Sequence, residues 1–284
     1  NFPLDFHAML LKLESSQDIG FGYYTDSSDL QITVDWPEEA VIEITKKDGD
    51  TGKNLAGAVY GVYSDNACTK LIAKMPPTDS NGSSRVTLTK TQDTVYLKEI
   101  TAPEGYVVQA SSYGVKLVVG STTKQTVTDK EQKGNLTVYK EGEVFVGAVS
   151  DENGTSFQYE KRRQKGAVYN VYAAEDIVTA GGKTVYKKGA EVAKNLITGE
   201  NGSVTVKNLP LGSYNVTEAQ APENFYNAKE TKKVTISYAG QTAEAAFSET
   251  TFTNDRQKAV VQVIKKDKDT ENTLSGGHFA LFAA

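Results

Sequence analysis

Residues 41–46 read Val-Ile-Glu-Ile-Thr-Lys, and residues 57–63 read Gly-Ala-Val-Tyr-Gly-Val-Tyr. Apolar and polar residues alternate in the first stretch, and valine and tyrosine dominate the second. Period-2 alternation and β-branched or aromatic residues are typical of half-buried strands. The stretch between them, Asp-Gly-Asp-Thr-Gly at 48–52, carries the residues of a turn. The sequence therefore predicts two β-strands separated by an acidic turn.

Both stretches recur along the chain. The lysine-ending strand returns as Leu-x-Val-x-Lys at 136–140 and as Val-x-Val-x-Lys at 261–265. The second strand returns as Gly-Ala-Val-Tyr-Asn-Val-Tyr at 166–172 and as Gly-His-Phe-Ala-Leu-Phe at 277–282. Self-similarity at a fixed order is the signature of repeated structural units.

Two further elements complete the repeat. A strand that runs into Glu-x-x-Ala-Pro-Glu occurs at 96–106 and again at 214–226. We call each Glu-x-x-Ala-Pro-Glu stretch, with the two or three residues after it, a box. A closing strand follows each box, ending at Asp129 in the first copy and at Asn254 in the second. The third copy contains neither element within the sequence, so we expect it to be incomplete.

This order predicts four parts of the 284-residue chain. They are an N-terminal segment at 1–38, a first repeat at 39–131, a second repeat at 132–256 with an insertion near 141–165, and the first two strands of a truncated third repeat at 257–284. Residues 1–38 match neither repeat and are either the tail of a preceding module or a separate cap. Short strands in units of about 100 residues predict an all-β chain of tandem Ig-like antiparallel β-sandwiches.

Composition excludes several classes of function. The net charge of −5 gives no basic face for nucleic acid, and no apolar run is long enough to cross a membrane. One cysteine and two histidines leave little material for a disulfide, a nucleophilic triad or a histidine-rich zinc site. The acidic turn at 48–52 lacks the bidentate glutamate of an EF-hand calcium loop. We therefore expect no metal and no cofactor.

Strand parity places polar groups where apolar ones are expected. Alternating side chains point to opposite faces of a strand, so a lysine two residues after an isoleucine or valine shares its inward face. Six side chains follow this rule: Lys46, Glu99 and Asp129 in the first repeat, and Lys140, Glu218 and Asn254 in the second.

Such a trio can form a covalent bond. Burial disfavours the ammonium form of lysine, and a neutral amine is a nucleophile that can attack the side-chain carbonyl of aspartate or asparagine. A neighbouring glutamate, held in its protonated form by burial, would hydrogen-bond that carbonyl and carry protons to the leaving group. The product would be a Lys–Asp or Lys–Asn isopeptide bond, made once by the protein on itself.

The ordered three-part motif closely resembles the collagen-adhesin B-type (CnaB, or SpaA-like) domains of Gram-positive surface adhesins and pilins. The resemblance covers about residues 39–284. It implies autocatalytic isopeptide bonds between Lys46 and Asp129 and between Lys140 and Asn254, with Glu99 and Glu218 as the catalytic groups. Lys265 would belong to an incomplete third trio.

The second repeat departs from the family pattern at one conspicuous position. Its box reads Ala-Pro-Glu-Asn-Phe, with Asn224 in place of the glycine, so its turn is expected to differ from that of the first repeat. The sequence also contains neither an LPxTG sorting signal nor a pilin-type polymerising lysine motif. We therefore expect any signal peptide or cell-wall anchor to lie outside this sequence.

Three functions follow from these observations. The first is a structural stalk of a bacterial cell-surface adhesin or pilin, extracellular, whose partners are neighbouring repeats. The second is a region that binds a host extracellular-matrix protein or glycan, through residues 1–38 or through the polar and aromatic insertion. The third, an enzyme for an external substrate, is disfavoured because no acid/base pair lies outside the trios.

Overall fold

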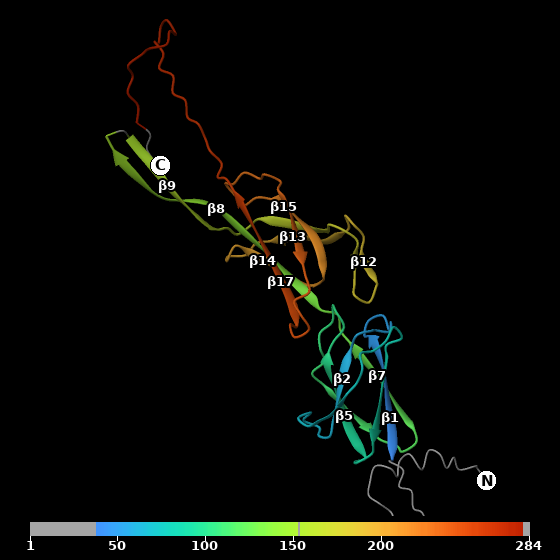
Figure 1. The fold of residues 1–284 in the computed structure, drawn as a ribbon. Helices are drawn as coiled ribbons and strands as arrows, with labels where there is room; N and C mark the ends of the chain where they lie inside the picture. Colours follow the sequence, from blue (N-terminus) through green and yellow to red (C-terminus); the bar gives the residue numbers. More distant parts are fainter. Residues whose placement is uncertain (1–37, 153, 281–284) are drawn as a thin grey trace, which may run out of the picture. The chain divides into compact units, whose positions relative to one another are not determined.

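The computed structural model describes residues 38–152 and 154–280 (Figure 1). Within these ranges the regular secondary structure consists of β-strands, as the alternating pattern predicts. The short helix that the sequence allows at 7–13 lies outside the described residues. In the part of the chain that the structure describes, no helix has the length and apolar character required to cross a membrane.

The first repeat forms a sandwich of two sheets. Its strands are β1 (Glu39–Asp48), β2 (Val59–Tyr63), β3 (Leu71–Lys74), β4 (Ser83–Thr89), β5 (Thr94–Thr101), β6 (Ser112–Lys116) and β7 (Thr122–Asp129). One sheet has the order β4-β1-β7, and the other has the order β3-β2-β5-β6.

The second repeat reproduces this arrangement strand for strand. Its strands are β8 (Lys133–Asp151), β10 (Val168–Ala173), β13 (Glu191–Ile197), β14 (Ser203–Pro210), β15 (Gly212–Gln220), β16 (Thr231–Ile236) and β17 (Ala245–Asn254). The sheet orders are β14-β8-β17 and β13-β10-β15-β16. Three strands have no counterpart in the first repeat: β9 (Gly154–Arg163), β11 (Ile177–Val178) and β12 (Thr184–Tyr186).

Each sandwich encloses its own apolar core. On β1 every second residue is buried, which places Ile42 and Ile44 on the inward face. The facing strands contribute Tyr60, Val62 and Leu97. The core of the second sandwich is built from the equivalent positions: Leu136, Val138, Tyr169, Val171, Val216 and Phe252. Alternation along the strands therefore determines which side chains fill the core.

The first and last strands of each repeat run parallel. β1 pairs with β7 from Val41–Thr122 to Asp48–Asp129, and β8 pairs with β17 from Lys133–Ala245 to Gly142–Asn254. The expected sandwich is confirmed, but its pairing is not antiparallel throughout. The last strand arrives from the opposite sheet by a crossover, so no tight hairpin forces it to run against the first.

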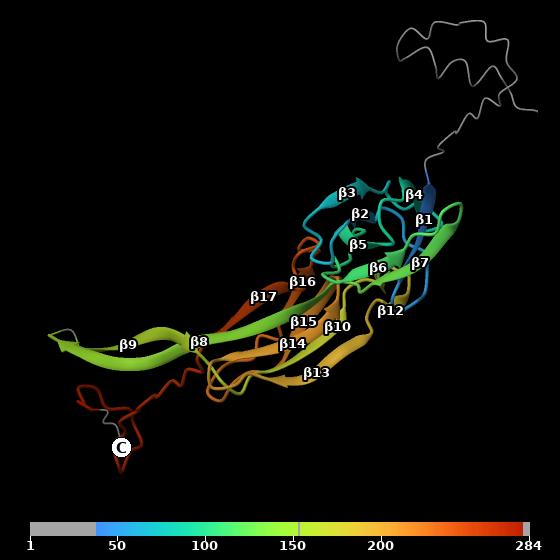
Figure 2. The ribbon, with the colours of Figure 1, turned by 90° about the horizontal axis from the view of Figure 1, so that it is seen from below.

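The predicted insertion is a β-hairpin. β8 continues beyond its pairing with β17 and folds back as β9, with a register from Glu141–Arg163 to Asp151–Gly154 (Figure 2). The hairpin closes at its base, where the Gln164 amide donates to the Lys140 carbonyl over 2.9 Å. In the first repeat the Leu55 amide donates to the Lys46 carbonyl over the same distance and closes the acidic turn. The hairpin therefore replaces that turn.

The turn of the second box keeps the shape of the first, contrary to the expectation from its sequence. Gly105 has φ 88°, and Asn224, at the equivalent position, has φ 70°. Asparagine tolerates this left-handed conformation better than most residues with a side chain. Both turns close in the same way, with Tyr106 donating its amide to Pro103 and Phe225 donating its amide to Pro222.

Residues 257–280 form neither of the two strands that the sequence predicts for the third repeat, and the end of the second, at 281–282, lies outside the described residues. Residues 257–280 are largely exposed, and the one bridge recorded among them joins Lys266 to Thr273. Their acidic turn does close, because the Leu274 amide donates to the Lys265 carbonyl. In the complete repeats, the first strand pairs with strands that come much later in the repeat. The described residues after 256 hold no such strands, and the segment therefore stays unpaired.

One contact distinguishes the two repeats. In the first, the Tyr106 hydroxyl donates to Asp48 over 2.6 Å. In the second, Gly142 stands at the position of Asp48 and Phe225 at that of Tyr106. A Cβ on Gly142 would lie 2.2 Å from the Phe225 ring. A polar pair has therefore been exchanged for a glycine against an aromatic ring.

We predict that Gly142→Ala destabilises the second repeat by about 1–3 kcal/mol, because the added methyl overlaps a buried ring. Gly147→Ala is the matched control, since that glycine lies on the same strand and has no atom near its Cβ position. Urea unfolding of both variants would measure the difference. Equal midpoints would show that the Phe225 ring moves aside freely.

Candidate functional site

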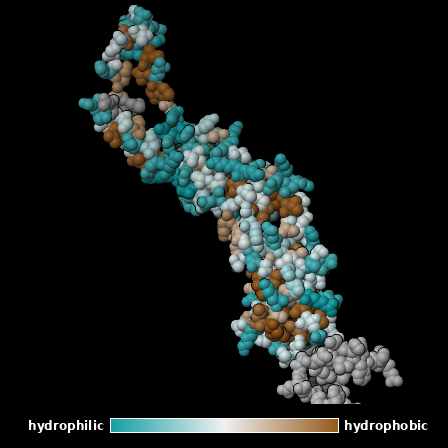
Figure 3. All heavy atoms as spheres, in the orientation of Figure 1, coloured by the Kyte–Doolittle hydropathy of each residue, from teal (hydrophilic) through white to brown (hydrophobic). Residues whose placement is uncertain are grey.

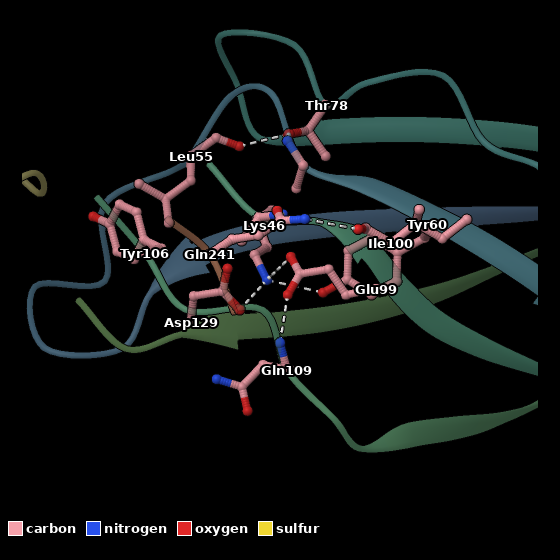
Figure 4. Close-up of polar contacts among 12 residues, drawn as sticks. Lys46, Leu55, Tyr60, Thr78, Glu99, Ile100, Tyr106, Gln109, Asp129 and Gln241 are labelled. Atoms are coloured by element: carbon pink, nitrogen blue, oxygen red, sulfur yellow. Dashed lines mark hydrogen bonds and ion pairs between the residues drawn. The ribbon is translucent and has the colours of Figure 1, made fainter. Parts of the chain in front are cut away.

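Three strands from both sheets bring the first trio together. Lys46 lies on β1, Glu99 on β5 and Asp129 on β7 (Figure 4). Their exposed fractions are 0%, 4% and 1%. An ammonium and two carboxyl groups thus share a dry interior, where unpaired charges are costly.

The lysine amine is the centre of this cluster. Its Nζ lies 2.8 Å from Glu99 Oε1 and contacts Asp129 Oδ1 directly. It also donates to the Tyr60 hydroxyl over 2.9 Å. The second oxygen of Glu99 accepts the Gln109 amide over 2.8 Å, which fixes the carboxyl plane. The amine is therefore held between a glutamate and the carboxyl group that it would attack.

Burial shapes the electrostatics of the first trio. Burial raises the pKa of Asp129 to about 7, with the Lys46 ammonium opposing the shift and Glu99 adding to it. Burial, together with the negative charges of Glu99 and Asp129, raises the pKa of Tyr60. The site therefore favours the neutral forms of Asp129 and Tyr60.

The second trio occupies the equivalent strand positions, with an amide as the third group and the glutamate as its centre. Lys140 from β8 lies 3.1 Å from Glu218 Oε1, and Asn254 Nδ2 donates to Glu218 Oε2 over 2.8 Å. The Tyr169 hydroxyl donates to the same glutamate over 3.4 Å. Lys140, Glu218 and Asn254 are all buried. Burial lowers the pKa of Lys140, against the opposing pull of Glu218, and so favours the neutral amine.

Reading the sequence alone did not identify the tyrosine in each site. Tyr60 and Tyr169 occupy the same place in the repeated Gly-Ala-Val-Tyr stretch and are fully buried. Each reaches its trio through the hydroxyl group. The only sequence feature that could have identified these tyrosines is their repetition at the same position of the second strand. That feature is equally typical of an ordinary core strand.

Two other predicted positions lie apart from these clusters. Lys265, the lysine of the third trio, is exposed. The acidic turn after Lys46 is closed by Asp48, whose Oδ1 accepts the amides of Asp50 and Thr51. Among the described residues, no group of three or more His, Cys, Asp or Glu side chains is arranged to hold a metal ion.

The repeated sandwich and its buried trios define a class of tandem prealbumin-like domains. The SpaA family, described as a prealbumin-like fold domain, matches residues 40–132 and 153–251. These matches cover most of the chain, which therefore belongs to this family. No curated protein matches the chain by sequence.

Solved structures that are similar to this chain include two bacterial pilins. The Bacillus anthracis TIE protein is 23% identical, with a TM-score of 0.48, over 77% of this chain and 34% of its own. A Streptococcal ancillary pilin is 21% identical, with a TM-score of 0.32, over 78% and 63% of the two chains. The major pilin subunit BcpA of Bacillus cereus is 14% identical, with a TM-score of 0.31, over 77% and 100%. The chain thus spans about a third of the TIE protein and less than two thirds of the ancillary pilin.

We predict that Lys46→Met makes the stability of the first repeat fall as pH rises from about 5 to about 8. The folded-state pKa of Asp129 is already raised by burial, and the substitution removes the cation that opposes this. The folded state then binds more protons than the unfolded state over this range, so raising the pH favours unfolding. Urea midpoints at several pH values would measure the slope.

Lys47→Met is the matched control. Lys47 is the next residue on β1 and lies on the opposite, partly exposed face. Its substitution should leave the pH dependence of unfolding unchanged. A flat pH profile for Lys46→Met would contradict the assignment of a buried, raised-pKa carboxyl to this site.

Proposed function

We propose that each complete repeat locks itself with one isopeptide bond, and that the chain is a stalk segment of a Gram-positive cell-surface adhesin or pilin. The observation that carries this proposal is the contact of Lys46 Nζ with Asp129 Oδ1 beside Glu99 in a dry core. Membership of the SpaA family supports it. In this proposal each repeat reacts once with itself and turns over no external substrate.

The first reaction joins an amine to a carboxylic acid. The neutral amine of Lys46 attacks Cγ of protonated Asp129, and a C–N bond forms as the C–OH bond breaks. Glu99 takes a proton from the attacking nitrogen and passes one to the departing oxygen, which leaves as water. The product is a neutral amide, so Lys46 and Asp129 can no longer form a buried ion pair once the bond is made.

The second reaction differs in its leaving group. Lys140 attacks Cγ of Asn254, and the C–Nδ2 bond breaks. Glu218 already accepts a hydrogen bond from that Nδ2 atom, so it is placed to return the lysine proton to it. Ammonia leaves, and the amide bond that remains links β8 to β17.

Such bonds suit a protein that is pulled at its ends. Lys46 and Asp129 are separated by 83 residues along the chain, and closing a loop of that size stabilises the folded state by about 4–5 kcal/mol in the chain-entropy model. The bond joins the first strand of the repeat to its last, so tension applied between the ends passes through covalent bonds. The proposed location is extracellular, where a lock that needs no cysteine is useful.

We predict that the intact denatured protein is about 35 Da lighter than its sequence mass, through loss of one water and one ammonia. Measured against its own sequence mass, Glu99→Ala should show a deficit smaller by about 18 Da, and Glu218→Ala one smaller by about 17 Da. Each substitution removes the proton carrier of one repeat. Intact-mass spectrometry of the denatured chains would measure both. A wild-type chain at its full sequence mass would rule out the bonds.

We predict that the two bonds respond differently to pH. Asp129 must be protonated to lose water, so the first bond should form more slowly as pH rises above about 7, the value to which burial raises its pKa. Asn254 does not titrate, so the second bond should show no such decline. Peptide mapping of chains synthesised at pH 6 to 9 would follow each bond separately. Parallel declines would contradict this assignment.

A second candidate function is binding of a host matrix protein or glycan by the β8–β9 hairpin. Hydrophobic residues reach the surface of the molecule along with polar ones (Figure 3). In the hairpin, Phe145 and Phe157 are each 59% exposed, and their rings lie 6.0 Å apart. A stalk has no evident use for such a surface. Aromatic side chains that remain exposed are common in contact surfaces.

We predict that replacing residues 143–161 by a short Asn-Gly turn abolishes binding to any matrix protein or glycan that the intact chain retains. The turn residues allow the two strands to close without the hairpin. Surface plasmon resonance against a panel of such ligands would measure it, with the mass deficit as the control for folding. A panel that binds neither chain would leave the stalk as the sole function.

A further inference from the structure

A loop of the second repeat contacts the first repeat beside its trio. Residues 237–244 connect β16 to β17, and this loop reaches the segment that follows β5. The Tyr238 hydroxyl donates to the Tyr106 carbonyl over 3.0 Å. The contact therefore falls on the box that follows Glu99.

Gln241 makes most of this contact. Its side-chain Oε1 accepts the Ala102 amide over 2.8 Å, and its Nε2 donates to the Ile100 carbonyl over 3.3 Å (Figure 4). Its main-chain carbonyl accepts the Val108 amide over 2.9 Å. One residue of the second repeat thus bonds to two separate segments of the first.

Both segments hold Glu99 in place. Ile100 directly follows Glu99, and Val108 directly precedes Gln109, whose amide donates to Glu99 Oε2. The pairing of β5 with β6 ends at Lys98, so this edge of β5 has no strand partner beyond that point. The side-chain amide of Gln241 takes the place of such a partner, because its Oε1 accepts from the Ala102 amide and its Nε2 donates to the Ile100 carbonyl.

The loop is itself fixed by Gln132, from the linker between the repeats. Gln132 is buried, accepts the Ala239 amide over 2.7 Å and donates to the carbonyls of Gly240 and Ala243. These bonds therefore restrain the backbone on both sides of Gln241. Fixed side chains lose little entropy when they hold another group in place.

We propose that Gln241 is a positioning residue for the Lys46–Asp129 reaction, so that the second repeat completes the active geometry of the first. This inference rests on the proposed isopeptide bond. Gln241 touches none of the reacting atoms and acts through the backbone on either side of Glu99. The first bond then forms at full rate only once the second repeat has folded against the box.

The test is the rate of each bond in one chain. Cell-free synthesis would be quenched into acid at successive times, and protease digestion with mass spectrometry would give the linked fraction of each pair. In Gln241→Ala we expect the Lys46–Asp129 bond to form about tenfold more slowly, because small misplacements of a catalytic group have large effects on rate. The Lys140–Asn254 bond should form at the wild-type rate and shows that the second repeat is folded.

Two further variants sharpen the test. Gln241→Glu keeps the acceptor for the Ala102 amide and loses the donor to Ile100, so its rate should lie between those of wild type and Gln241→Ala. Thr242→Ala changes the neighbouring exposed residue and should leave both rates unchanged.

The outcomes separate the two proposals. A wild-type chain that never loses water from the first repeat would refute the bond itself. If the first bond forms at equal rates in wild type and Gln241→Ala, the bond stands and the positioning role is wrong. An equal slowing of both bonds in Gln241→Ala would also refute it, since the effect would then be one on folding in general.

Discussion

The burial of a lysine amine on the inner face of the first strand is the constraint on which each repeat depends. A charged amine in a dry core is unfavourable unless opposite charges and hydrogen bonds surround it. Glu99, Asp129 and Tyr60 provide these around Lys46. They come from the strands on either side of the sandwich interior, so the position of this one side chain ties the two sheets to each other. Around Lys140 a single carboxylate, that of Glu218, has this role, and burial lowers the pKa of the amine.

The two repeats keep this centre while their surroundings differ. Asp48 and Tyr106 form a hydrogen bond in the first repeat, and Gly142 and Phe225 fill the same space in the second. The residues of the two pairs cannot be mixed, because an aspartate at position 142 would have no room beside the Phe225 ring. The trios differ in a parallel manner, with a titrating acid in one and a neutral amide in the other. The two repeats therefore differ in chemistry and packing while they share one strand order.

Strand alternation and the internal repeat were sufficient to predict the sandwich fold and the six residues that the structure brings together. The parallel pairing of β1 with β7 was not predictable in this way, because alternation fixes which face is buried and not which direction a distant strand runs. Tyr60 looked like one core tyrosine among several. Gln241 lies in a polar loop, and its contacts depend on backbone groups, which leave no pattern in the sequence. Residues 257–280 form no strand, because pairing partners, and not local propensity, determine whether such a segment becomes one.

The carbonyl of the buried lysine has a further consequence for how these repeats can vary. It accepts the amide that closes the acidic turn in the first repeat, and it accepts the amide that closes the whole β8–β9 hairpin in the second. In both repeats the chain comes back to the carbonyl of the buried lysine, after a short turn in the first and a long hairpin in the second. Residues inserted at this point lie outside the sandwich. They change neither the relative positions of Lys140 and Asn254 nor the points at which the chain leaves and re-enters the sandwich. The fold thus contains a site where new surface can be acquired without any adjustment of the core.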